Sequence, residues 1–176
     1  MSGSPRFARD DAKGCIMRKL PHRLQTIANY IETGASVADI GTDHGKIPVY
    51  LALRGTARRI IASDISINSL YRAQGLAEGY FMTDKIEFIN APGLTKITAA
   101  DIDTLIISGL GGETIISILH SARWPLTEAI NGKLRIILQA QTKHKKLIEY
   151  LHDCGCIIKE EKTVYDGGRK YIIILV

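Results

Sequence analysis

Two acidic residues, Asp39 and Asp64, stand at the ends of two apolar segments and mark where this chain could do chemistry. Residues 36–48 (SVADIGTDHGKIP) run from a short apolar strand through a glycine-marked turn into a helix, and a second apolar strand at 59–63 is followed by Asp64. Glycines in such a turn let the backbone approach a ligand, and the distal carboxylate can accept hydrogen bonds from ribose hydroxyls. This half of the chain is therefore predicted to bind a nucleoside.

The turn departs from the dinucleotide fingerprint GxGxxG because Asp43, followed by His44, occupies the place of the middle glycine. A carboxylate there repels a pyrophosphate but suits a cationic or neutral group. S-adenosylmethionine (SAM) has both features, since its ribose would meet Asp64 and its sulfonium and amino-acid tail would lie near Asp39, Gly41 and Asp43. A structural βα turn with a surface acid is the alternative interpretation of the same residues.

Length and composition limit the organisation of the chain. Its 176 residues, 45% of them apolar, suffice for one ordinary domain with a sizeable core. No apolar run reaches the roughly 20 residues of a membrane span, and no hydrophobic signal segment begins the sequence, so we expect a cytoplasmic protein without membrane contact. The low, odd cysteine count (Cys15, Cys154 and Cys156) indicates reduced structural thiols, and no metal site is expected.

The net charge of +5 is compatible with an anionic partner such as RNA, although many ordinary enzymes are equally basic. A solvated helix face is the alternative explanation for any single basic cluster. Three clusters on one small domain favour a polyanionic substrate: Arg18, Lys19, His22 and Arg23; Arg54, Arg58 and Arg59; and Lys143, His144, Lys145 and Lys146.

Alternating apolar strands and amphipathic helices predict the elements that position these residues. Residues 1–16 show no periodicity and predict a disordered tail, whereas 17–176 predict one folded domain. The sequence predicts strands at 36–40, 59–63, 86–90, 103–108 and 133–138, and helices at 20–33, 44–53, 66–78, 113–120 and 143–154. It also predicts a terminal hairpin, with strands at 156–164 and 170–176 around an Asp-Gly-Gly turn.

Five strands alternating with helices predict a doubly wound, mostly parallel α/β sheet, to which the hairpin adds an antiparallel edge strand. A seven-stranded sheet of this kind is typical of the Rossmann-like class I methyltransferases and unusual in dinucleotide dehydrogenases. The hairpin is thus a second feature, independent of the turn after the first strand, that favours SAM.

Ligands of open α/β sheets lie beyond the carboxyl ends of the strands. The segment 109–112 (GLGG) follows the predicted central strand, and its three glycines favour close approach to a substrate or to the transferred methyl group, with a plain tight turn as the alternative. The residues expected to contact the cofactor at this edge are Asp39, Gly41, Asp43, Gly45, Asp64, Ile65, Asn90, Ala91, Ser108 and Gly109.

Taken together, several motifs resemble the bacterial tRNA (adenine-N1)-methyltransferases of the TrmK type, which modify adenine 22. The matching segments are LPHRL at 20–24, ADIGTDH at 38–44 with Ile47-Pro48, ISGLGG at 107–112, Leu138-Gln139 and YDGG at 165–168. The resemblance covers 17–176 and implies methyl transfer from SAM to N1 of an adenine in tRNA. Substrate contacts are then expected from Arg23, Gly111, Gly112, Gln139, Gln141, Lys143 and Lys145.

The implied chemistry asks little of the protein. Adenine N1 already carries a lone pair, so alignment with the sulfonium supplies most of the barrier reduction. The product ring is cationic, and a nearby carboxylate would stabilise the developing charge. We assign that role to Asp43, with His44 as a weaker companion that could equally be a structural hydrogen-bonding residue. The base must be unstacked from the tRNA to be reached.

Three features differ from the family pattern. Asn90-Ala-Pro-Gly93 replaces an acidic residue that contacts the cofactor's adenine, Ala140-Gln141 replaces Pro-Asn, and the family's C-terminal helical extension is expected to be absent. Two rival functions follow: a methyltransferase of the same fold acting on another substrate, and a non-catalytic RNA- or nucleoside-binding module. A NAD-dependent oxidoreductase is disfavoured because the glycine turn after the first strand does not match a pyrophosphate-binding loop. We expect a monomer or a weak homodimer.

Overall fold

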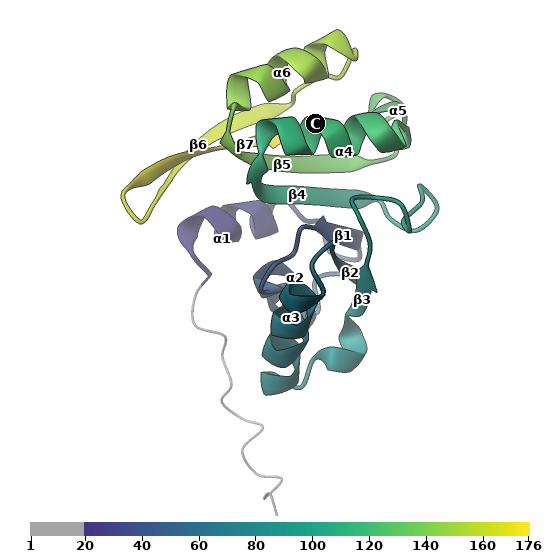
Figure 1. Ribbon diagram of the computed structural model, residues 1–176, viewed down its shortest axis with the longest axis vertical. Coiled ribbons are helices and arrows are strands. Elements are labelled where there is room, and N and C mark those ends of the chain that lie inside the picture. The colour runs from purple at the N-terminus through teal and green to yellow at the C-terminus, as the bar shows by residue number, and fades with distance from the viewer. Residues whose placement is uncertain (1–19) are drawn as a thin grey trace, which may run out of the picture.

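The computed structural model describes residues 20–176, so the tail predicted at 1–16 lies outside the described residues. Seven strands form one sheet in the order β3-β2-β1-β4-β5-β7-β6 (Figure 1). The strands are β1 (Ser36–Ile40), β2 (Arg59–Asp64), β3 (Glu87–Asn90), β4 (Thr104–Gly111), β5 (Arg135–Thr142), β6 (Glu160–Asp166) and β7 (Arg169–Leu175). The helices are α1 (His22–Asn29), α2 (Lys46–Arg54), α3 (Ile67–Gly79), α4 (Gly112–Ala122), α5 (Trp124–Ile130) and α6 (His144–Asp153), with a 3₁₀ turn, η1 (Thr83–Lys85).

The central strand β4 pairs in parallel with β1 on one side and β5 on the other. Its residues Leu105, Ile106 and Ile107 are fully buried, as expected for the predicted central strand of a parallel sheet that is covered on both faces. The strand is longer than predicted, because Leu110 and Gly111 continue to pair with β5 through two register shifts. The first three residues of the glycine segment 109–112, for which a plain tight turn was the alternative interpretation, therefore belong to the irregular end of a strand.

The two faces of the sheet are covered by different helices. Ile106 points to a core shared with Ile27 of α1 and Leu51 of α2, whereas Leu105 and Ile107 point to a core shared with α4 and α6. Figure 1 shows α4, α5 and α6 on one side of the sheet and α1, α2 and α3 on the other. This three-layer arrangement confirms the predicted Rossmann-like α/β fold.

The hairpin β6–β7 is present, but the reversed strand does not lie at the edge of the sheet. β7 is inserted between β5 and β6 and runs antiparallel to both, so the edge strand is β6. Its first strand begins at Glu160, four residues later than predicted. The end of the hairpin projects beyond the rest of the sheet (Figure 1).

Helix α5 was not predicted from the sequence. Proline breaks a helix when it lies in the interior, but in the first turn it costs no hydrogen bond. Pro125 lies in the first turn of α5. Arg123, with a φ of 59°, separates α4 from α5.

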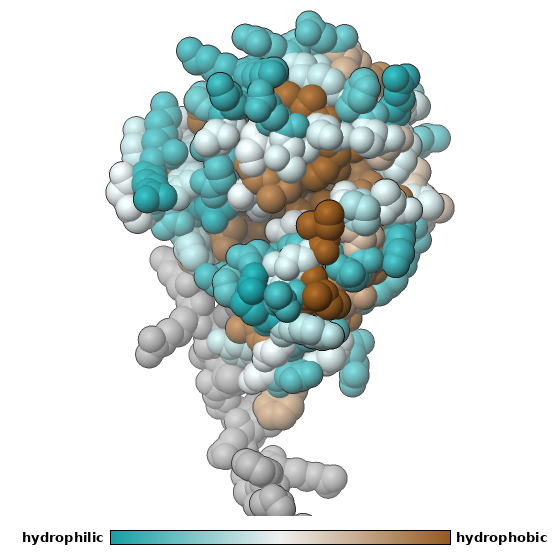
Figure 2. All heavy atoms as spheres, viewed as in Figure 1, coloured by the Kyte–Doolittle hydropathy of each residue, from teal (hydrophilic) through white to brown (hydrophobic). Residues whose placement is uncertain are grey.

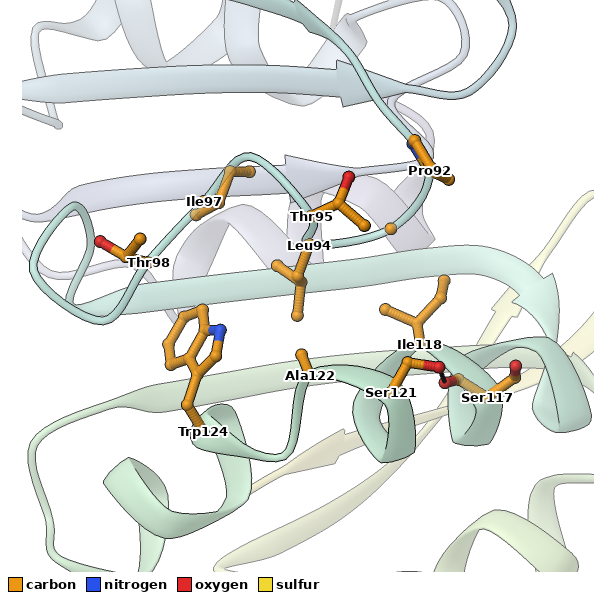
Figure 3. A pocket seen from close by; sticks show the side chains of 11 residues that line it. Pro92, Leu94, Thr95, Ile97, Thr98, Ser117, Ile118, Ser121, Ala122 and Trp124 are labelled. Carbon is orange, nitrogen blue, oxygen red and sulfur yellow. Dashed lines mark hydrogen bonds between the residues drawn. The ribbon is translucent and has the colours of Figure 1, made fainter.

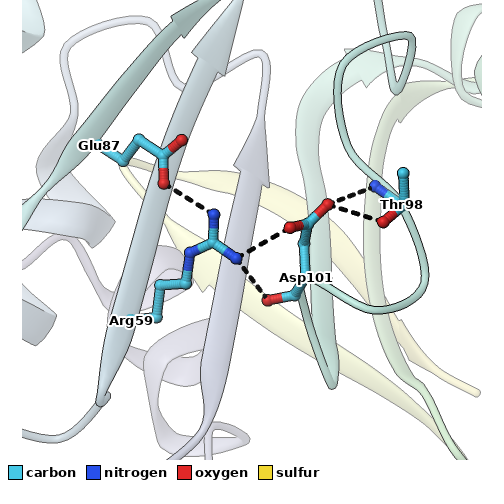
Figure 4. A network of polar contacts seen from close by, with 4 residues as sticks. All are labelled: Arg59, Glu87, Thr98 and Asp101. Atoms are coloured by element: carbon cyan, nitrogen blue, oxygen red, sulfur yellow. Dashed lines mark hydrogen bonds and ion pairs between the residues drawn. The ribbon is translucent and has the colours of Figure 1, made fainter.

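No helix connects β3 to β4 in the described structure, and a polar network anchors that connection instead (Figure 4). Arg59 at the start of β2 donates to Glu87 and Asp101, both at 2.9 Å, and Asp101 accepts from the amide and hydroxyl of Thr98, each at 2.8 Å. The hydrogen bond from the Thr98 amide, and next the one from Arg59, lower the pKa of Asp101 to about 2. The loop is thereby fixed at the amino edge of the sheet.

Candidate functional site

A cavity of about 410 Å³ opens at the carboxyl ends of β1, β2 and β4. β1 and β4 are adjacent in the sheet, and the strand order continues from them in opposite directions. Open α/β sheets bind their ligands at such a switch in strand order. The residues that line the cavity are Arg23, Leu24, Asp39, Gly41, Thr42, Asp43, His44, Lys46, Ile47, Asp64, Ser69, Ser108, Gly109, Leu110 and Gln141. Nine of them were candidates from the sequence: Arg23, Asp39, Gly41, Asp43, His44, Asp64, Ser108, Gly109 and Gln141.

The turn after β1 is shaped by two glycines with positive φ, 73° at Gly41 and 64° at Gly45. Gly41 lines the cavity. Gly45 does not, and a Cβ placed there would lie 2.7 Å from the Cβ of Ala73 on α3. The structure therefore accounts for Gly45 by the close packing of the turn against α3, although the sequence placed it among the cofactor contacts.

Asp64 is held in one orientation by two backbone donors. Its Oδ2 accepts the Asp43 amide at 3.1 Å and its Oδ1 accepts the Ser66 amide at 2.8 Å. A carboxylate has about four lone-pair sites, so both oxygens keep acceptor capacity for other donors. Asp64 is 9% exposed and lines the cavity. The residue is thus suited to accept the two hydroxyls of a ribose.

The segment after β3 supports this turn rather than lining the cavity. The Asn90 side chain donates to the carbonyl oxygens of Asp64 at 2.9 Å and Ile65 at 3.0 Å, and the Ala91 amide donates to Asp64 at 3.2 Å. Both N–H groups of the Asn90 side chain are therefore used, and its oxygen remains as an acceptor. Ile65 is 72% exposed and presents an apolar surface directly after the carboxylate.

Asp39 lies at the bottom of the cavity and is 4% exposed. Its Oδ2 accepts a hydrogen bond from the Thr42 hydroxyl at 2.8 Å. Burial raises the pKa of Asp39 to about 6, against the opposing effect of Thr42 and with a further raise from the Asp64 charge. A cationic group in the cavity would relieve this penalty, because it would favour the ionised form.

Asp43 is not a free carboxylate. It has a φ of 48°, its Oδ1 accepts from Arg72 at 2.8 Å, and its Oδ2 lies 3.5 Å from His44 Nε2. Arg72 also donates to the Ser69 hydroxyl at 3.0 Å. Arg72 was not predicted from the sequence, because its contact with Asp43 depends on how α3 is rotated against the turn. A spacing of three residues between Ser69 and Arg72 on one helix face is the only local hint.

Arg23 of α1 forms the opposite end of the cavity. Its Nη1 donates to Gln139 Oε1 at 2.7 Å, and its guanidinium lies over the ring of Tyr171 at 5.1 Å. Gln139 is fully buried and supports Arg23, so it offers no surface to a substrate, contrary to the expectation of a direct contact. Gly109, with a φ of 79°, lies beside Arg23 and Gln141.

Four other substrate candidates lie outside the cavity. A Cβ at Gly112 would lie 2.7 Å from the Lys143 carbonyl oxygen, so this glycine permits α4 to start close to the link between β5 and α6. A Cβ at Gly111 would lie 3.4 Å from the Thr142 hydroxyl. Lys143 and Lys145 are exposed at the start of α6. These residues border the carboxyl edge of the sheet without facing the pocket.

A second cavity of about 440 Å³ lies between the β3–β4 connection and α4 (Figure 3). Figure 3 shows Leu94, Ile97, Ile118 and Trp124 around it, and none of its lining residues is ionisable. It is as large as the first cavity, but its polar side-chain groups are only the indole N–H of Trp124 and the hydroxyls of Thr95, Thr98, Ser117 and Ser121. The first cavity is therefore the candidate site.

Two further findings concern residues 20–176. No group of three or more His, Cys, Asp or Glu side chains in that part of the chain could hold a metal ion. None of its helices has the length and apolar character needed to cross a membrane.

Comparison with known proteins agrees with this geometry. A family model described as a methyltransferase domain matches residues 20–174. The tRNA (adenine(22)-N(1))-methyltransferase of Bacillus subtilis is 32% identical over 157 residues, which are 89% of this chain and 64% of that protein. This chain therefore spans slightly less than two thirds of that relative.

Two solved structures show the same likeness. The B. subtilis m1A22 tRNA methyltransferase TrmK has a TM-score of 0.80 at 32% identity, covering 89% of this chain and 65% of that one. M. capricolum TrmK, in complex with the cofactor product S-adenosyl-homocysteine, has a TM-score of 0.74 at 30% identity, covering 89% of this chain and 67% of that one.

Proposed function

Since the chain belongs to the methyltransferase-domain family, we propose that it transfers a methyl group from SAM to N1 of adenine 22 in tRNA. The observation that carries the proposal is one cavity that joins two acids, Asp39 and Asp64, to the turn of β1 at one end and to Arg23 and Gln141 at the other. The similarity to the B. subtilis enzyme supports the choice of substrate. A tRNA substrate would also place the enzyme in the cytoplasm.

The residues of the first half of the cavity fit SAM. Asp64, fixed by two amides, would accept the ribose hydroxyls, and Ile65 would offer apolar contact beside them. Asp39, buried with a single hydroxyl donor, would face the cationic amino-acid portion. When bound, SAM supplies an electrophilic methyl group on a sulfonium.

The other half of the cavity would receive the target base. Arg23 and Gln141 border Gly109, where the absence of a side chain leaves room for a flat ring. The protein's main contribution would be to align adenine N1 with the methyl group and to exclude water. Asp43 would favour the cationic product ring, but its pairing with Arg72 makes this effect smaller than that of a free carboxylate.

Three separate measurements test the proposal. Calorimetry should show SAM binding to the purified chain, and radiolabelled methyl transfer should occur on an unmodified tRNA transcript but not on one with guanine at position 22. Nucleoside mass spectrometry should identify the product as 1-methyladenosine. SAM binding without any tRNA methylation would point to another substrate, and tRNA binding without SAM binding would point to a binding module.

A further inference from the structure

Ion pairs engage several of the basic residues that form clusters in the sequence, among them Lys146, which lies 2.8 Å from Glu113. Arg58 and Arg59, at the amino edge of the sheet, are paired with Asp103, Glu87 and Asp101. Lys143, Lys145, Arg169 and Lys170 have no carboxylate within 4.0 Å among residues 20–176. This second group therefore carries positive charge that is available to an external partner.

This second group lies at the carboxyl edge, beside the cavity. β7 pairs with β5 up to Ile173 opposite Gln139, and the hairpin then continues outward to its end at Asp166 and Arg169. α6 begins at this same edge, directly after β5. Figure 1 shows the hairpin projecting from the sheet, and Figure 2 shows hydrophilic surface over its end.

Two contacts attach the hairpin to the wall of the cavity. The Arg23 amide donates to Asp166 Oδ2 at 3.3 Å, and His22 Nδ1 lies 3.2 Å from the Tyr165 carbonyl oxygen. The Arg23 guanidinium meanwhile lies over Tyr171 of β7. The hairpin end and the substrate end of the cavity therefore form one continuous, fixed surface.

The chemistry of the hairpin end matches a nucleic acid. Tyr165 is 67% exposed and lies opposite Lys170 in the ladder, so an aromatic ring and an ammonium group are neighbours. Cations bind phosphates, and exposed aromatic rings stack on unpaired bases. Asp166, the carboxylate at the tip, is engaged by the Arg23 amide.

We propose that the end of the β6–β7 hairpin and the start of α6 form the RNA-docking surface that flanks the target nucleotide. Arg169, Lys170, Lys143 and Lys145 contact phosphates, and Tyr165 stacks on an unpaired base. This inference rests on the proposed function, because the cavity beside the surface must receive a base of the same RNA.

The test compares two double variants that each remove two positive charges. Arg169→Gln/Lys170→Gln changes the docking surface, and Lys133→Gln/Lys159→Gln changes exposed lysines at the opposite, amino edge of the sheet. Binding of unmodified tRNA is measured from about 50 to 200 mM salt, and SAM affinity is measured in parallel. Tyr165→Ala, against Phe81→Ala as the exposed aromatic control, tests stacking.

The hairpin variant should weaken tRNA binding at least tenfold and reduce the slope of log K against log salt by about two, since each lost phosphate contact lowers it by about one. SAM affinity should stay within twofold of wild type in all variants. Equal tRNA binding by the two double variants would overturn the docking surface while leaving the proposed function intact. A wild-type chain that binds SAM but no tRNA would refute the proposed substrate, and the surface with it.

Discussion

Replacement of Asp64 by asparagine should weaken SAM binding by about tenfold to a hundredfold. The carboxylate accepts the amides of Asp43 and Ser66 and, in the proposed complex, two ribose hydroxyls. Asparagine keeps the shape but turns one acceptor oxygen into a donor, so one backbone amide is left facing an N–H group. A hydrogen bond to a charged group contributes about 1.5–3 kcal/mol, and each 1.4 kcal/mol is about tenfold in affinity.

Asp103→Asn is the matched control. Asp103 also accepts from a backbone amide, that of Ser36, with both oxygens at 3.1 Å, but it lies at the amino edge of the sheet. Both variants should lose about 1–2 kcal/mol of folding free energy, seen as a fall of several degrees in Tm. Calorimetric titration with SAM should separate them. Unchanged affinity in Asp64→Asn, or an equal loss in Asp103→Asn, would refute the role given to Asp64.

Three further predictions address other parts of the site and its supports. Burial raises the folded-state pKa of Asp39 to about 6 from 3.8, so the folded protein loses stability as pH rises between these values. A bound cation needs the ionised carboxylate. SAM affinity should therefore fall as pH drops below about 6. Calorimetry between pH 5 and 8 checks this, and persistence of the same pH dependence in Asp39→Asn would exclude Asp39 as its source. Gly45→Ala should lower the free energy of unfolding by roughly 2–5 kcal/mol in urea titrations, because Gly45 has a positive φ and a Cβ there would lie 2.7 Å from Ala73. The control Gly34→Ala, also at a positive φ but with no atom within 4 Å of the added Cβ, should lose only about 1–2 kcal/mol. Equal losses would argue against the packing explanation. Asp43→Asn should slow single-turnover methyl transfer by about tenfold, or about 1.4 kcal/mol, with less effect on tRNA affinity, and near-full turnover would remove Asp43 from the catalytic group.

Most strands of the parallel sheet were predictable because each is a buried apolar run bounded by polar or glycine residues. Leu105–Ile107 form such a run, and all three residues are fully buried in the middle of a sheet covered on both faces. The exception is β3, in which Glu87 and Asn90 are exposed. The resemblance to TrmK-type enzymes is likewise confirmed by the relatives, since its motifs are local and contiguous. The topology of the sheet then places the carboxyl ends of β1, β2 and β4 side by side. Asp39, Asp64 and Gly109 could therefore be predicted to share one site.

The rest depends on contacts between distant segments. The extension of β4 through Gly111 requires register shifts against β5, which no local pattern encodes. The pairing of Asp43 with Arg72, and the burial of Gln139 beneath Arg23, depend on how helices are placed on the sheet. A sequence shows that a residue is polar and near an edge, but not whether another side chain already occupies its hydrogen-bonding groups.

Asp43 joins two functions that can vary separately. Its amide fixes the Asp64 carboxylate through the backbone, while its side chain meets Arg72. Asparagine and glycine tolerate a φ of 48°, so either could replace it without disturbing the amide. A substitution at this position could therefore change the electrostatic potential of the cavity while the hydrogen bond that orients the Asp64 carboxylate stays the same.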